Sequence, residues 1–355
     1  MSIYYLLFFI TIFIQFAVSA KNDKEYLRRT IITFIPLFLF GALRVDFGYD
    51  YPTYEAEFHL AHSSQNLWDI SEHSETGYVI LERIVPTWRL LIILTSALTC
   101  ISYIFVFYKC IPPKYSWLAI FLLFLAGDKT IFFQFSGIRN AIVIAIMYLS
   151  FSLIRDRKWI LLGLLTALGT TIHTSAILFI PIVFLICTNK EMTKREAWIW
   201  IISMVVLQAV SLNAVFDQVI NVVGLYLDRY SAYAEFAEEI GDNRTFLLRS
   251  FCAVFVVLIV YCMRHTKLNK EENVICRMAL IFVFSFLLGS LNLRMPQFFG
   301  FAFVAGSTIV VSKWRDEFLR LGYLSLTILF LAYSFFIAYV LQPGFPYRVY
   351  HSILE

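Results

Sequence analysis

The stretch from Leu90 to Tyr108, LLIILTSALTCISYIFVFY, contains no charged side chain. A helix of about 20 apolar residues crosses the hydrocarbon core of a bilayer, so this stretch predicts a membrane span. Apolar stretches of similar length recur almost from one end of the chain to the other. The sequence therefore predicts an all-α, polytopic membrane protein.

The composition of the whole chain excludes most other classes of protein. Of its 355 residues 60% are hydrophobic and 15% charged, and the mean hydropathy is +0.74, whereas soluble domains carry about 25% charged residues. The formal net charge of +4 is too small to indicate a nucleic-acid-binding protein. None of the six cysteines forms a CxxC pair, so we interpret them as packing residues rather than metal ligands.

Charged breaks divide the chain into about twelve predicted transmembrane helices within a single integral membrane domain, residues 1–355. Two larger loops separate them, 44–89 and 213–245, and the second contains the apolar spacing of an amphipathic helix. A weaker apolar run, Tyr78 to Val85, is predicted to be re-entrant or interfacial because Pro86 ends it. The predicted spans lie near 3–20, 30–43, 90–108, 115–127, 139–154, 159–172, 174–187, 197–212, 246–263, 275–291, 298–311 and 321–341.

Basic residues are distributed unevenly between the two alternating sets of loops. One set holds 19 of the 29 Lys and Arg side chains, and the positive-inside rule places that set in the cytoplasm. Both termini and both larger loops are then predicted to be periplasmic. Nine of the ten basic residues on the outer side are Arg, whose planar fork binds phosphate in a bidentate manner. The bias has two interpretations, phosphate binding and ordinary salt bridging.

The densest group of polar and aromatic residues follows the second predicted span, in the sequence RVDFGYDYPTY from Arg44 to Tyr54. Asp46 and Asp50 are predicted counter-ions for Arg44, and Gly48 is predicted to permit a turn. Tyr49, Tyr51 and Tyr54 present apolar ring faces that suit sugars, although an interfacial aromatic belt would have the same composition.

Three further motifs lie at the outer ends of predicted spans: Glu75-Thr-Gly-Tyr78, Ser136-Gly-Ile-Arg139-Asn140 and Ile172-His173-Thr-Ser-Ala176. Arg139 in the first turn of a helix opposes the helix dipole, so an anionic partner is expected. Asp128 and a substrate phosphate are the two candidates. His173 is an ionisable group near membrane depth, which makes it a candidate site residue, although a packed, hydrogen-bonded histidine is the simpler interpretation.

Two more arginines, Arg249 and Arg294, are predicted at outer span ends, where each can also snorkel to lipid headgroups. If the spans bundle, these arginines converge with Arg44, Arg139 and His173 into a clamp for a diphosphate. Tyr230 belongs to a row of tyrosines in the second larger loop and is a candidate sugar contact. No nucleotide-binding, metalloprotease or hydrolase motif is present in the sequence.

The four motifs, in this order and spacing, resemble the EpsG family of bacterial polysaccharide polymerases, which are related to the Wzy-type O-antigen and capsule polymerases. The resemblance implies a GT-C-like inverting glycosyltransferase in the bacterial inner membrane, making O-antigen, capsule or exopolysaccharide. Its implied donor and acceptor are glycans linked to undecaprenyl diphosphate, in contact with the lipid bilayer and with a flippase and chain-length regulator as partners. No metal or other cofactor and no nucleic acid is implied.

The resemblance implies roles for the site residues. Arg139, Arg249 and Arg294 would stabilise the leaving diphosphate, and Asp46, Asp50 or His173 would accept the proton of the acceptor hydroxyl. Three alternatives stay open: a GT-C enzyme with a lipid-monophosphate sugar donor, an O-antigen ligase, and a flippase or transporter of lipid-linked glycans. The expected substrate-binding residues are Arg44, Tyr51, Tyr54, Glu75, Tyr78, Arg249 and Tyr230.

Overall fold

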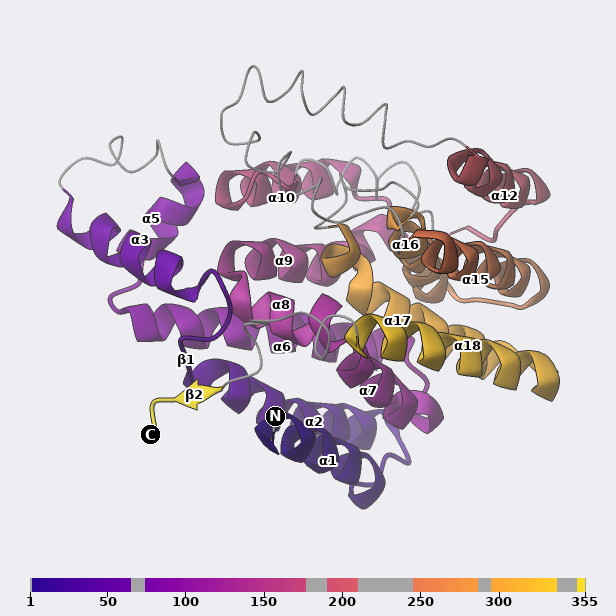
Figure 1. Cartoon of the computed structure of the whole chain (residues 1–355), viewed down its shortest axis with the longest axis horizontal. Coiled ribbons are helices and arrows are strands. Elements are labelled where there is room, and N and C mark those ends of the chain that lie inside the picture. The colour runs from indigo at the N-terminus through magenta and orange to yellow at the C-terminus, as the bar shows by residue number, and fades with distance from the viewer. Residues whose placement is uncertain are drawn as a thin grey trace.

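The computed structural model describes residues 2–64, 74–176, 190–209, 245–286, 295–336 and 350–354, which form a bundle of α-helices with one short two-stranded sheet (Figure 1). The elements of the N-terminal half are α1 (Ser2–Ala17), α2 (Asp23–Leu43), β1 (Arg44–Val45), α3 (Tyr51–Ser63), α5 (Thr76–Ile84), α6 (Trp88–Cys110), η1 (Pro113–Tyr115), α7 (Ser116–Leu125), η2 (Gly127–Lys129), α8 (Ile131–Ser136), α9 (Ile138–Arg155) and α10 (Trp159–Ile172). Those of the C-terminal half are α12 (Lys194–Ala209), α15 (Thr245–His265), α16 (Lys270–Ser285), α17 (Met295–Lys313), α18 (Glu317–Phe336) and β2 (His351–Ser352).

The predicted all-α, multi-pass membrane architecture is confirmed. Four described helices, α2, α6, α17 and α18, are long and apolar enough to cross a bilayer, and a bent pair of helices brings the number to five. Shorter apolar helices occupy 3–17, 138–154, 159–172 and 250–265. The count of twelve crossings stays a prediction, and most of the predicted span 174–187 lies outside the described residues.

The predicted span 115–127 is one arm of a broken helix. The segment from Pro113 to Leu125 and the segment from Gly127 to Ser136 meet at an angle of 77°. At the break, Asp128 pairs with Lys129 at 2.8 Å, so Asp128 is not the partner of Arg139. Gly300 of α17 packs directly against this break, since a Cβ there would lie only 2.7 Å from the Lys129 carbonyl oxygen. Hydropathy alone did not predict the second arm.

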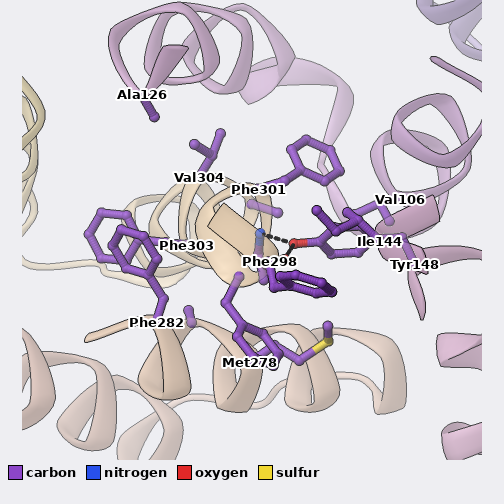
Figure 2. Packing of buried hydrophobic residues seen from close by; sticks show 14 of the residues in the cluster. Val106, Ala126, Ile144, Tyr148, Met278, Phe282, Phe298, Phe301, Phe303 and Val304 are labelled. Atoms are coloured by element: carbon purple, nitrogen blue, oxygen red, sulfur yellow. Dashed lines mark hydrogen bonds between the residues drawn. The ribbon is translucent and has the colours of Figure 1, made fainter. Parts of the chain in front are cut away.

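Aromatic packing between α6, α9, α16 and α17 forms the centre of the bundle (Figure 2). The Phe301 ring stacks on Tyr103 of α6 at a centroid distance of 3.9 Å and meets Tyr148 of α9 edge-on. The Tyr148 hydroxyl donates to the Phe298 carbonyl and accepts from the Ala302 amide, each at 2.9 Å. Because buried hydroxyl groups need partners, this double contact fixes the register of α9 against α17.

Two short helices, α3 and α5, lie side by side at one end of the bundle, where α10 and α6 contact them (Figure 1). A turn leads into α3, and Gly48 takes a φ of 92° there, which confirms its predicted role. The strand β2 pairs antiparallel with β1, with Arg44 opposite Ser352. The described C-terminal residues therefore lie at the same end of the bundle as α3 and α5.

Candidate functional site

Arg139 lies in the first turn of α9 and is held between two carboxylates and two aromatic rings. Its Nη1 donates to Glu75 Oε2 at 2.7 Å, and its Nη2 donates to Glu57 of α3. The guanidinium carbon lies 5.0 Å from the ring centroid of Tyr54 and 5.0 Å from that of Tyr78. The sequence predicted an anionic partner for Arg139, because a cation in the first turn opposes the helix dipole. That partner consists of two glutamates that are distant in the sequence, and the two aromatic rings add cation–π contacts.

Glu75 connects three parts of the chain. Besides Arg139, its carboxylate binds His173 Nδ1 at 2.9 Å and accepts from the Thr174 amide and hydroxyl at 3.2 and 3.3 Å. Glu75 occupies the N-cap position of α5, yet its side chain makes no capping bond to that helix. The carboxylate is instead directed to the start of α9 and the end of α10.

The environments of Glu75 and Glu82 shift the pKa values of these carboxyl groups in opposite directions. Burial alone would raise the pKa of Glu75, but the hydrogen bonds from His173 and Arg139 outweigh it and hold that pKa well below its usual range. Burial, reinforced by the nearby Glu57 charge, raises the pKa of Glu82 to about 8. Perturbed pKa values of this kind are common at functional sites, although structural ion pairs also produce them.

The site is partly open to the outside at the end of the bundle. Between 12% and 19% of the side-chain surface of Glu57, Glu75, Arg139 and His173 is exposed. Below them, several buried polar atoms have no hydrogen-bond partner within the described part of the chain: Tyr78 Oη, both Glu82 carboxylate oxygens, Arg139 Nε and Asn140 Nδ2. The Tyr78 hydroxyl is near enough to influence Glu82 without meeting hydrogen-bond geometry. These atoms offer hydrogen-bonding capacity for a polar ligand.

The model of the EpsG family matches residues 27–350, nearly the whole chain. The chain belongs to the EpsG family. This is a family of polysaccharide polymerase-like membrane proteins, as the four motifs of the sequence predicted. No curated protein and no solved structure matches the chain.

In this EpsG-family protein, five of the predicted site residues lie together: Tyr54, Glu75, Tyr78, Arg139 and His173. They come from all four motifs, and Tyr54, the last residue of the first motif, lies on α3. Tyr51 and Tyr54 are buried, so the prediction of open ring faces for sugars is wrong for them, whereas Tyr49 is 63% exposed. The Tyr54 and Tyr78 rings contact the Arg139 guanidinium instead.

The predicted pairing of Arg44 with Asp46 and Asp50 is wrong. Arg44 is buried between α2 and α6, where its Nη1 donates to the Gly41 carbonyl and, at 2.7 Å, to the Ser96 hydroxyl. Asp46 and Asp50 make no ion pair with any residue that the structure describes. The guanidinium turns back along its own helix because neutral oxygens are available there, and this assigns Arg44 a packing role at the end of α2. Tyr51 belongs to the same region, since its hydroxyl accepts from Trp88 Nε1 at 3.0 Å.

Three other predicted residues stay predictions. Arg294 and Tyr230 lie outside the described residues, as does the whole of the predicted amphipathic helix of the second larger loop. Arg249 falls within α15, but its side chain is not among those described. Their proposed contacts with diphosphate and sugar therefore have no structural test.

No role was predicted from the sequence for Glu57 or for Glu82. Glu57 lies one helical turn after Tyr54 on α3, so the spacing of the two residues puts them on one face. Glu82 likewise lies one turn after Tyr78 on α5. If these two short segments had been predicted as helices, both glutamates would have been predicted as neighbours of the tyrosines.

Gly77 allows α5 to approach α10, and we expect Gly77→Ala to separate them. A Cβ at Gly77 would lie 2.8 Å from the Thr171 carbonyl oxygen, two residues before His173. We expect a loss of thermal stability of about 1–3 kcal/mol, as for other overpacked positions. The matched control is Gly163→Ala on α10, where nothing lies within 4 Å of the added Cβ. Equal melting temperatures for the two variants would contradict this account.

Glu82→Gln is expected to change how stability depends on pH. The pKa of about 8 exceeds the value of about 4.3 for an unfolded glutamate, so the folded state binds this proton more tightly. That contribution is complete below about pH 4.3 and is lost as the pH rises towards 8. Gln keeps the shape of the glutamate side chain but does not ionise. Between pH 5 and 8 the melting temperature of the wild type should therefore fall by about 3 °C more than that of Glu82→Gln. The control is Glu55→Gln on α3, whose melting temperature should depend on pH as that of the wild type does. If the melting temperatures of wild type and Glu82→Gln change with pH in parallel, the prediction is contradicted.

Proposed function

We propose that this protein is a membrane glycosyltransferase that polymerises oligosaccharide repeat units carried on undecaprenyl diphosphate. The observation that supports this most directly is the Glu75–Arg139–His173 cluster at one end of an apolar bundle. It combines a cation suited to a diphosphate with an imidazole oriented by a carboxylate. The apolar helices beneath it suit a polyprenyl chain, and the family match agrees with a polymerase-type enzyme.

The proposed reaction is a single displacement that inverts the anomeric carbon. The acceptor hydroxyl oxygen forms a bond to the anomeric carbon while the bond from that carbon to the donor's phosphate oxygen breaks. The electron pair leaves with the undecaprenyl diphosphate, whose charge Arg139 stabilises, with Arg249 and Arg294 as further candidate cations.

His173 is the proton acceptor that the geometry favours over Asp46 and Asp50. When Nδ1 donates its hydrogen to Glu75, Nε2 is the basic nitrogen of a neutral imidazole. Glu75 then fixes the tautomer and stabilises the imidazolium that forms when His173 takes the hydroxyl proton. Neither aspartate contacts the cluster among the described residues, and this difference supports the choice.

The site is proposed to face the periplasm. The basic residues of the sequence place the ends of α2, α9 and α10 that border the cluster on the outer side. The pairing of β2 with β1 brings the described C-terminal residues to that same end, which agrees with outward-facing termini. Reporter fusions at both termini test this, and reporters that are active only in the cytoplasm would overturn the orientation.

The decisive experiment supplies the purified protein in nanodiscs with one synthetic lipid-linked repeat unit as both donor and acceptor. We expect a ladder of products that grow by whole repeat units, with release of undecaprenyl diphosphate. Failure to extend the unit in repeated trials with a native repeat unit would contradict the proposal. Transfer of a single sugar from a lipid monophosphate, transfer to a lipopolysaccharide core, or movement of an unextended lipid would identify the glycosyltransferase, ligase and flippase alternatives.

The same assay tests the expectation that no metal is needed. Arginines can neutralise a departing diphosphate without a divalent cation, so polymerisation is expected to continue in excess chelator. Loss of activity in chelator and its recovery with magnesium or manganese would contradict this. That outcome would instead give Asp46 and Asp50 a role as oxygen ligands.

A further inference from the structure

The two carboxylates on Arg139 are held very unequally. Glu75 is bound by Arg139, by His173 and by two groups of Thr174. Among the described residues Glu57 forms an ion pair only with Arg139, and it is the most exposed member of the cluster, with 19% of its side chain accessible. Displacing Glu57 removes one charged hydrogen bond, whereas displacing Glu75 would remove four contacts.

The occupied state of Arg139 leaves little positive charge for a substrate. One guanidinium carries one charge, and two carboxylates already face it. An incoming anion therefore has to replace one of them. The guanidinium itself stays in place during such an exchange, because Tyr54 and Tyr78 contact it and Glu75 continues to hold it.

An uncovered arginine at this position would bind the wrong ligands. Membrane phospholipids present single phosphates in great excess at the bilayer surface, and arginine binds phosphate groups readily. A competing carboxylate imposes the same affinity penalty on every anion. A weakly held monophosphate then fails to occupy the site, while a diphosphate, with more charge and more acceptor oxygens, still does.

We propose that Glu57 is a specificity-determining residue that occupies the anion site of Arg139 until the diphosphate of a lipid-linked donor displaces it. The inference rests on the proposed function, since it assumes that a diphosphate reaches Arg139. It assigns α3 a part in substrate selection. No covalent bond changes in the exchange, and one ionic contact replaces another.

The test measures binding of farnesyl diphosphate to wild type, Glu57→Gln and Glu55→Gln in phosphatidylcholine nanodiscs. Removing the competing charge should tighten binding by about tenfold or more in Glu57→Gln, which corresponds to one charged hydrogen bond. Glu55 lies on the same helix without contacting Arg139, so Glu55→Gln should bind like the wild type. Unchanged or weaker binding in a folded Glu57→Gln protein would overturn the proposal.

A second arm replaces part of the phosphatidylcholine by phosphatidylglycerol. The wild type should keep its affinity for farnesyl diphosphate, whereas Glu57→Gln should lose several-fold, because the phosphate of phosphatidylglycerol competes without the neutralising choline of phosphatidylcholine. Equal sensitivity of the two proteins would overturn the proposed selectivity. If Glu57→Gln fails to fold, Glu57→Asp replaces it in both measurements. The shorter aspartate carboxylate holds Arg139 less well, so this variant should show the same two changes in affinity, but smaller ones.

These binding measurements need no glycan, so they test the role of Glu57 independently of the proposed polymerase activity. A wild type that binds farnesyl diphosphate but never extends a lipid-linked repeat unit would contradict the proposed function alone. A wild type that polymerises normally, with Glu57→Gln binding no more tightly, would contradict only the role assigned to Glu57.

Discussion

Arg139→Ala is expected to abolish polymer and to destabilise the protein. The substitution leaves Glu57 and Glu75 near each other without their common cation, and Glu82 lies close by. Breaking a buried ion pair by removing one partner costs about 3–5 kcal/mol, and the exposure of this cluster puts the expected loss at the low end. Turnover should fall by at least about 10³-fold, since charge stabilisation of the leaving group is also lost. The measurements are the product ladder and thermal unfolding.

Two variants separate the role of Arg139 in chemistry from its role in folding. Arg139→Lys keeps the charge but cannot bridge two carboxylates with one planar group, so we expect a folded protein with little activity. Arg83→Ala is the matched control, because Arg83 also links α5 to α3 but donates only to the Ala61 and Ser64 carbonyls. Long-chain polymer from Arg139→Lys would reduce Arg139 to a point charge. A loss in Arg83→Ala as large as in Arg139→Ala would show that the α3–α5 contact itself is what matters.

The sequence predicted the apolar helices and most of the residues of the cluster, but not how these residues pair. Arg139 and Glu57 are separated by 82 positions and Arg139 and Glu75 by 64. Such contacts depend on how α3 and α5 fold over the ends of α9 and α10, which hydropathy does not encode. A sequence reading favours neighbours, and it therefore paired Arg44 with Asp46 and considered Asp128 for Arg139.

The same limit explains the errors in local structure. The sequence predicts a loop with accessible rings from Tyr51 to Tyr54, whereas α3 turns the Tyr51 and Tyr54 rings inward. The bend after Leu125 lies where Gly300 of α17 approaches the Lys129 backbone, which is a tertiary feature. Gly48 was predictable because its conformational role is local.

His173→Ala is expected to lower turnover by about 10²–10⁴-fold while leaving the fold intact, which is the range for loss of a general base. Arg139 keeps both carboxylates in this variant, and Glu75 keeps its bonds to Arg139 and Thr174. The melting temperature should therefore change far less than in Arg139→Ala. His62→Ala is the matched control, because His62 contacts only its own helix, at the Phe58 carbonyl, and the aromatic ring of Phe58.

The pH dependence of the rate distinguishes a base from a packing residue. An imidazole that accepts a proton is inactive once it is protonated, so the wild-type rate should fall as the pH is lowered and the residual rate of His173→Ala should lack that fall. Glu75→Gln retains a hydrogen-bond acceptor for Nδ1 but no charge to stabilise the imidazolium, and it should lose turnover without losing affinity for the diphosphate, because one carboxylate fewer faces Arg139. If His173→Ala and wild type show the same pH profile, His173 serves only to hold Glu75, and the proton acceptor has to be sought among Glu57, Asp46 and Asp50.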